Sequence, residues 1–178
     1  MTKHHRLPSH TYTLLVPLEQ FERSFRGGHE RWPRHVTLLR DVSHVGTRHE
    51  VVDAVHDVTK RHKPFTVTFG PQHCQYGDRP AQDVTNGGEE LRALHADLLE
   101  TLLDHHGSLR GVDLVYTERG EGYSPHCSGE VALATQERIG VWTVLLLMKF
   151  AKGVDEVGDD GSIGSVKEIA RGFRLGAT

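Results

Sequence analysis

The chain has little cysteine, no long apolar run and almost no net charge. Each of these absences excludes a class of protein. Two cysteines in 178 residues exclude a disulfide framework and favour a reducing compartment. The longest apolar stretch, 141–150, is interrupted by Thr143 and Lys149 and is far shorter than the roughly 20 residues of a membrane span. The first ten residues lack the apolar segment of a secretory signal. We therefore expect a cytoplasmic protein that does not enter a membrane.

The charge balance argues against broad binding of duplex DNA, because the net charge is −3. Residues 1–40 nevertheless hold seven Lys/Arg against three Glu, a local excess of +4. Such a patch suits a small anionic ligand, although a solvated face would look the same. Length and composition predict one globular domain over 1–178, with an acidic, glycine-rich mobile loop at 153–165. Nothing in the sequence fixes an oligomeric state.

Short β-type runs dominate the sequence and are interrupted by two helical patterns. The predicted strands are 10–18, 34–40, 65–69, 112–117, 123–133, 141–150 and 169–175. Thr47 and Glu50 have the spacing of a capping box, which predicts a helix that runs to about Lys63. Asn86 and Glu89 predict a second, leucine-rich helix that ends near 107.

Because helices and strands do not alternate strictly, the order favours an α+β domain with largely antiparallel sheets. The two halves of the chain look alike. Each has a capped helix and a short strand that carries His-x-Thr or His-x-Ser.

The two motifs are His35-Val36-Thr37 and His126-Cys127-Ser128. On a strand, residues i and i+2 point to the same face, so each imidazole would share a cleft with a hydroxyl. Two imidazoles near one phosphodiester can act as general base and general acid, and the hydroxyls can donate to the phosphoryl oxygens. This chemistry requires no metal, and the spacing does not say which histidine is the acid.

The spacing alone is weak evidence, because with fourteen histidines some matches arise by chance. A third match, at His106 and Ser108, follows the second predicted helix, and we set it aside. The residues that flank the motifs at His35 and His126 are more informative. Pro33 and Pro125 closely precede these motifs and favour an extended backbone before each strand. Two buried structural histidines on unrelated strands remain the competing interpretation.

With these flanks, the sequence resembles the 2H phosphoesterase superfamily, which includes the 2'-5' RNA ligase-like and cyclic phosphodiesterase proteins. The resemblance implies two similar β-rich lobes flanked by helices, with the active site in the groove between them. It implies catalytic roles for His35 and His126 and phosphate-binding roles for Thr37 and Ser128. Two departures are Arg34, which separates the first motif from its proline, and the polar residues after Cys127.

The activity implied by the resemblance is hydrolysis or transesterification of phosphodiesters in a nucleotide or short RNA. Candidate substrates are 2',3'-cyclic phosphates, 2'-5' linkages and small linear or cyclic oligonucleotide signals, and some viral relatives destroy such signals to blunt host defence. A non-catalytic nucleotide- or RNA-binding module that retains the groove is the alternative.

Five further residues are candidates for substrate binding, each with a plainer interpretation. Tyr12, Trp32 and Tyr123 could stack on a base, or could be core or rim aromatics. Arg34 could contact phosphate or solvent, and Lys149 could face inward from a late strand. No Cys-x-x-Cys or His-Glu-x-x-His spacing occurs, and we expect neither a metal nor a cofactor.

Overall fold

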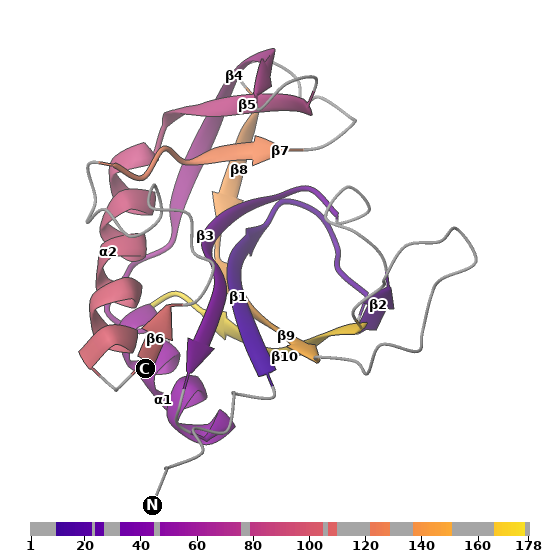
Figure 1. Cartoon of the computed structure of the whole chain (residues 1–178). Helices are drawn as coiled ribbons and strands as arrows, with labels where there is room; N and C mark the ends of the chain where they lie inside the picture. The colour runs from indigo at the N-terminus through magenta and orange to yellow at the C-terminus, as the bar shows by residue number, and fades with distance from the viewer. Residues whose placement is uncertain are drawn as a thin grey trace, which may run out of the picture.

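A single curled sheet with two helices on one side makes up the fold (Figure 1). The computed structural model describes residues 10–22, 24–26, 33–44, 47–75, 79–104, 107–109, 122–128, 137–150 and 166–176. Within them the strands are β1 His10–Pro17, β2 Ser24–Arg26, β3 His35–His44, β4 Phe65–Gln75, β5 Arg79–Asn86, β6 Gly107–Leu109, β7 His126–Ser128, β8 Arg138–Val141, β9 Thr143–Phe150 and β10 Val166–Arg174. The helices are α1 Arg48–Thr59 and α2 Gly88–Asp104.

The sheet has two halves that meet at β3 and β7. Its strand order is β2-β10-β9-β1-β3-β7-β5-β4-β8, with β6 paired to the far end of β3. The pairings along this order are antiparallel, so the predicted α+β class with antiparallel lobes is confirmed. The two strands that carry the motifs are therefore the two at which the lobes join.

The first helix begins as predicted. The N–H of Glu50 donates to the hydroxyl of Thr47, and the carboxylate of Glu50 accepts from the N–H of Thr47. This reciprocal cap satisfies two amides that the first turn leaves without helical partners. The apolar face of α1, which includes Val51, Val55 and Val58, is buried. The helix ends at Thr59 rather than near Lys63.

The predicted cap of the second helix is wrong. Asn86 is the last residue of β5, paired with Thr68 of β4, so the sheet holds it. The helix begins at Gly88, and the carbonyl of Gly87 accepts from the N–H of Leu91 (3.2 Å). Gly87 has φ of 79° and packs so closely on the carbonyl of Thr66 that a Cβ would not fit. The turn from strand to helix therefore requires glycine.

Several other predictions are corrected or lie outside the described residues. The single strand predicted at 141–150 is two strands, because the chain leaves β4 in one lobe and joins β1 and β10 in the other at Trp142. The third match, which was set aside because it follows the second helix, overlaps a short strand, since Gly107 and Ser108 belong to β6. Residues 112–117 and 153–165 lie outside the described residues, as does most of 123–133 beyond β7.

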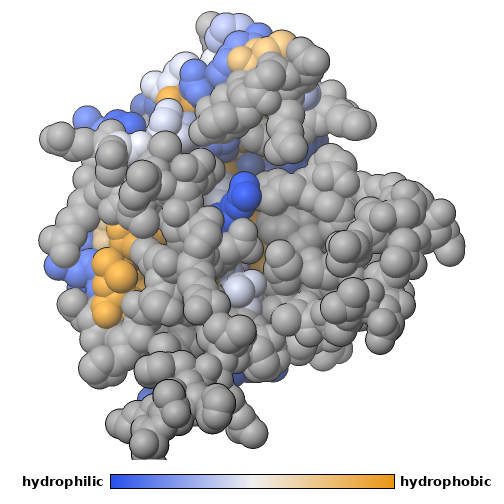
Figure 2. All heavy atoms as spheres, viewed as in Figure 1, coloured by the Kyte–Doolittle hydropathy of each residue, from blue (hydrophilic) through white to orange (hydrophobic). Residues whose placement is uncertain are grey.

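Large exposed apolar side chains are few in the described part of the chain. They are Leu103, near the end of α2, and Trp142, whose side chain is 61% exposed. Among the residues that Figure 2 colours by hydropathy, the apolar ones visible from this side lie in small separate areas. Among the described helices, none combines the length and the hydropathy needed to cross a membrane.

Candidate active site

The two motifs lie side by side on adjacent antiparallel strands. His35 of β3 pairs with Ser128 of β7, and Val36 pairs with Cys127. Continuing this register by one pair places Thr37 opposite His126, so each histidine lies across from the hydroxyl residue of the other motif. Diagonal neighbours in an antiparallel pair have Cβ atoms about 7 Å apart, which lets two imidazoles approach one phosphoryl group. The two histidines therefore do not lie on unrelated strands.

Each candidate imidazole is held by the same contact to its own backbone. Nδ1 of His35 lies 2.6 Å from the carbonyl oxygen of Pro33, and Nδ1 of His126 lies 2.9 Å from that of Ser124. A carbonyl oxygen only accepts hydrogen bonds, so Nδ1 carries the proton in both rings. In the neutral form, Nε2 is then the basic nitrogen of each ring. Both motifs thus orient their imidazoles for proton transfer at Nε2.

The two rings differ in burial. His35 is 3% exposed, whereas His126 is partly exposed. The pKa of His35 is lowered from 6.5 to about 4, mainly by burial and also by the proximity of His126, although the Pro33 carbonyl and Glu19 partly offset these effects. His35 is therefore neutral at physiological pH, as a general base must be.

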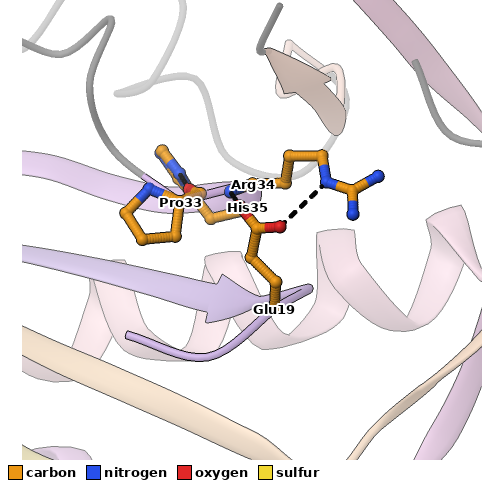
Figure 3. Close-up of polar contacts among 4 residues, drawn as sticks. All are labelled: Glu19, Pro33, Arg34 and His35. Atoms are coloured by element: carbon orange, nitrogen blue, oxygen red, sulfur yellow. Dashed lines mark hydrogen bonds and ion pairs between the residues drawn. The ribbon is translucent and has the colours of Figure 1, made fainter. Parts of the chain in front are cut away.

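Glu19, in the segment that follows β1, holds the entry to the first motif. One carboxylate oxygen accepts from the backbone N–H of Arg34 (2.6 Å), and the other accepts from Nε of the same residue (3.1 Å). In Figure 3 the side chain of Glu19 reaches Arg34, whose guanidinium extends away from the ring of His35. Phe21, two residues after Glu19, lies edge-on to the ring of His35 with centroids 6.0 Å apart. This short segment therefore orients and shields the first histidine.

The remaining candidates fall into three groups. Tyr12 and Tyr123 are buried, which matches the core alternative for both. Arg34 is partly exposed beside the first motif. Trp32 and the side chains of Lys149 and Ser128 lie outside the described residues, although Ser128 is placed by its backbone pairing.

Sequence reasoning missed three residues that contact the motifs or the residues beside them. Glu19 and Phe21 left no signal, because they act from an irregular segment whose position depends on the fold. His95 did leave one, since it lies on the apolar stripe of α2, one residue after Leu94 and three before Leu98. It is fully buried, and its Nδ1 donates to the carbonyl of Leu38 (2.8 Å).

Two other chemistries have little support at the site. Cys127 lies between the second histidine and Ser128 but is buried, and burial raises the pKa of its thiol to about 11. It is therefore a poor nucleophile at neutral pH. Within the described ranges, no group of three or more His, Cys, Asp or Glu side chains is arranged to hold a metal ion.

Comparisons with known proteins decide the family. The model of the 2'-5' RNA ligase superfamily matches residues 9–143, which include both motifs and most of the chain. The chain belongs to this superfamily. Membership in this group of 2H phosphoesterases supports a phosphodiesterase- or ligase-type activity. No curated protein matches the chain in sequence.

Solved structures of phosphoesterases share the fold at low sequence identity. A phosphoesterase superposes with a TM-score of 0.56 at 11% identity, covering 94% of this chain and 98% of its own. E. coli LigT in complex with 3'-AMP gives 0.53 at 13% identity, covering 93% and 97%. TT0787 of Thermus thermophilus gives 0.53 at 13% identity, covering 94% and 98%. This superfamily member therefore has the fold of these proteins over almost its whole length.

Proposed function

We propose that this superfamily member is a metal-independent phosphodiesterase that acts on nucleotide or short RNA substrates, with His35 and His126 as its acid/base pair. The observation that carries the proposal is the mirrored pair of imidazoles on β3 and β7, each with Nδ1 bound to the carbonyl two residues earlier. Because Nδ1 of each ring donates to a carbonyl, Nε2 is the nitrogen that can transfer a proton in both rings.

The roles of the two histidines follow from their unequal burial. Nε2 of neutral His35 accepts the proton of the attacking hydroxyl or water, and the oxygen forms a bond to phosphorus. Nε2 of protonated His126 donates a proton to the departing oxygen as its bond to phosphorus breaks. The protein thus ends the step with His35 protonated and His126 neutral, and proton exchange with water restores it. In the reverse direction the two roles exchange.

Charge that develops on the non-bridging oxygens is stabilised by the hydroxyls of Thr37 and Ser128 in this proposal. Thr37 shares the face of His35 two residues on, and Ser128 is the strand partner of that histidine. The guanidinium of Arg34, held by Glu19 at the edge of the motif, supplies positive charge for a second phosphate in this proposal. Trp32 and Lys149 remain proposed contacts by sequence alone.

The substrate class rests on the superfamily and on charge. The LigT structure contains 3'-AMP, and the local excess of positive charge in residues 1–40 suits a small anion. Candidate substrates are 2',3'-cyclic phosphates, 2'-5' linkages and small linear or cyclic oligonucleotides. Cleavage of oligonucleotide signals would make the protein an antagonist of nucleotide-based immune signalling.

A substrate panel with product analysis tests the proposal. The purified protein is incubated with 2',3'-cyclic nucleotides, 2'-5' and 3'-5' oligoadenylates and cyclic dinucleotides, and the product ends are read by mass spectrometry. We expect turnover of at least one class, unaffected by EDTA. Substituting either His35 or His126 with alanine should lower kcat about 10²- to 10⁴-fold. His49→Gln, which removes an exposed histidine of α1, is the matched control.

Two results would refute this function. Inactivation by EDTA would indicate a metal site. Binding of a nucleotide with unchanged affinity in both alanine variants, without turnover by the wild type, would identify a binding module that retains the fold.

A further inference from the structure

Two buried aromatic side chains, Tyr123 and His95, connect the backbone segments beside the two motifs. Tyr123 lies three residues before His126, and His95 lies on α2. Their rings stack with centroids 4.2 Å apart and an angle of 12° between the planes. Tyr123 is 2% exposed and His95 is 0% exposed, so neither reaches a substrate. Their role must therefore come from the contacts that they make inside the protein.

Both side chains donate to the backbone of β3 at the point where its pairing with β1 becomes irregular. Along β1 the partner of Leu15 is Thr37, but the partner of Leu14 is Leu39, so Leu38 is an extra residue in β3. This is a β-bulge directly after the first motif. The hydroxyl of Tyr123 donates to the carbonyl of Thr37 (2.6 Å). The Nδ1 of His95 donates to the carbonyl of Leu38 (2.8 Å).

A bulge leaves backbone groups that the neighbouring strand cannot satisfy, and a buried carbonyl without a partner is costly. Two side-chain donors at successive carbonyls therefore stabilise this irregular backbone. The bulge also changes the direction of the strand, and with it the direction of Thr37 and His35.

The same tyrosine fixes the entry to the second motif. The residue after it, Ser124, supplies the carbonyl that holds Nδ1 of His126. The next residue, Pro125, has its carbonyl bound to the N–H of Val84 in β5 (3.1 Å), which ties the segment to the second lobe. The hydroxyl of Tyr123 ties it to β3 in the first lobe. One side chain thus sets where the carbonyl that orients His126 lies relative to the first motif.

We propose that Tyr123 and His95 are positioning residues that set the distance and orientation between the two histidines of the site. Tyr123 joins the entry of the second motif to the backbone of the first, and His95 supports its ring and holds the bulge. This inference rests on the proposed phosphodiesterase function for its kinetic consequence, but its structural consequence, the tautomer of His126, is measurable without any substrate.

The test combines kinetics with a tautomer measurement. Tyr123→Phe removes the hydroxyl and retains the stacked ring. We expect kcat to fall about 10- to 100-fold with KM within about twofold, because small displacements of catalytic groups have such effects. Long-range ¹H–¹⁵N NMR should show the Nδ1–H tautomer of His126 in the wild type and a mixture of tautomers in the variant. Thr59→Val is the matched control, since it removes a buried hydroxyl that donates to the His56 carbonyl of α1 (3.1 Å).

A second variant covers the case in which Tyr123→Phe does not fold. His95→Asn keeps a donor near the carbonyl of Leu38 but removes the ring on which Tyr123 stacks, and it should also mix the tautomers of His126. The proposal is overturned if either folded variant keeps the wild-type tautomer and kcat, or if Thr59→Val lowers kcat as much as Tyr123→Phe does. If the wild type turns over no substrate, the proposed function fails, while the tautomer measurement still decides the positioning role.

Discussion

The burial of His35 should make the stability of the protein depend on pH between the pKa of this residue in the folded protein and its pKa in the unfolded chain. Burial lowers its pKa to about 4 in the folded protein, whereas the unfolded chain has the ordinary value of 6.5. Between these values the unfolded chain binds a proton that the folded protein does not, so unfolding becomes easier as the pH falls. Above pH 6.5 both states are neutral at this residue, and the effect vanishes.

The size of the effect follows from the shift. A pKa difference of one unit between the folded and unfolded states changes the free energy of unfolding by about 1.4 kcal/mol. The shift of His35 therefore lowers the free energy of unfolding by about 3 kcal/mol as the pH falls through the whole range. The side chain is almost completely buried, which means that solvent screening reduces this little. Against a typical unfolding free energy of roughly 5–15 kcal/mol, such a loss is easily measured.

Urea unfolding at a series of pH values from 4 to 8 measures this contribution. His35→Gln removes the titrating group, so its stability should fall less steeply with decreasing pH than that of the wild type, and the difference between the two curves should span about 3 kcal/mol. His49→Gln controls for the loss of an imidazole from an exposed position. Parallel curves for wild type and His35→Gln between pH 4 and 6.5 would show that the site does not hold this ring neutral.

Three substitutions around the site and the first helix give further tests. Glu19→Gln removes a charge that raises the pKa of His35, so the acidic limb of kcat/KM should move to lower pH; movement to higher pH would contradict the electrostatic argument. Phe21→Ala should move the same limb to higher pH, because it lets water reach the ring, and an unmoved limb would mean that Phe21 does not shield His35. Thr47→Ala should cost about 1 kcal/mol of stability in urea unfolding with kcat unchanged, whereas an unaltered midpoint would show that the capping box contributes nothing.

Much of the site was predictable because its signals are local. A His-x-Thr or His-x-Ser strand needs only the two-residue repeat of a strand to place imidazole and hydroxyl on one face. The capping box at Thr47 and Glu50 was equally readable, since all its partners lie within four residues. The pairing of β3 with β7 was not readable from either strand. The resemblance to a known superfamily implied only that the two motifs face one groove between two lobes.

The missed features depend on contacts between distant parts of the chain. The cap at Asn86 has the right residues in the right order, but pairing with Thr68 keeps Asn86 in the sheet, and a tertiary contact overrides a local preference. The break at Trp142 arises because β8 and β9 belong to different lobes, which no apolar pattern encodes. The bulge at Leu38 is likewise invisible in sequence, because Leu38 and Leu39 would fit an ordinary buried strand.

Paired motifs of this kind present a chemical problem that the fold resolves. The two motifs are nearly interchangeable in sequence and in their Nδ1 contacts, yet in the proposed mechanism one imidazole accepts a proton while the other donates one. Their neighbours differ. β3 is paired along β1 on its other side, and Phe21 covers His35, whereas β7 has only three residues and His126 is the strand partner of the exposed Asp83. Unequal burial therefore distinguishes two otherwise equivalent groups, and within the proposed mechanism it assigns His35 as the base when the attacking group is a hydroxyl or water.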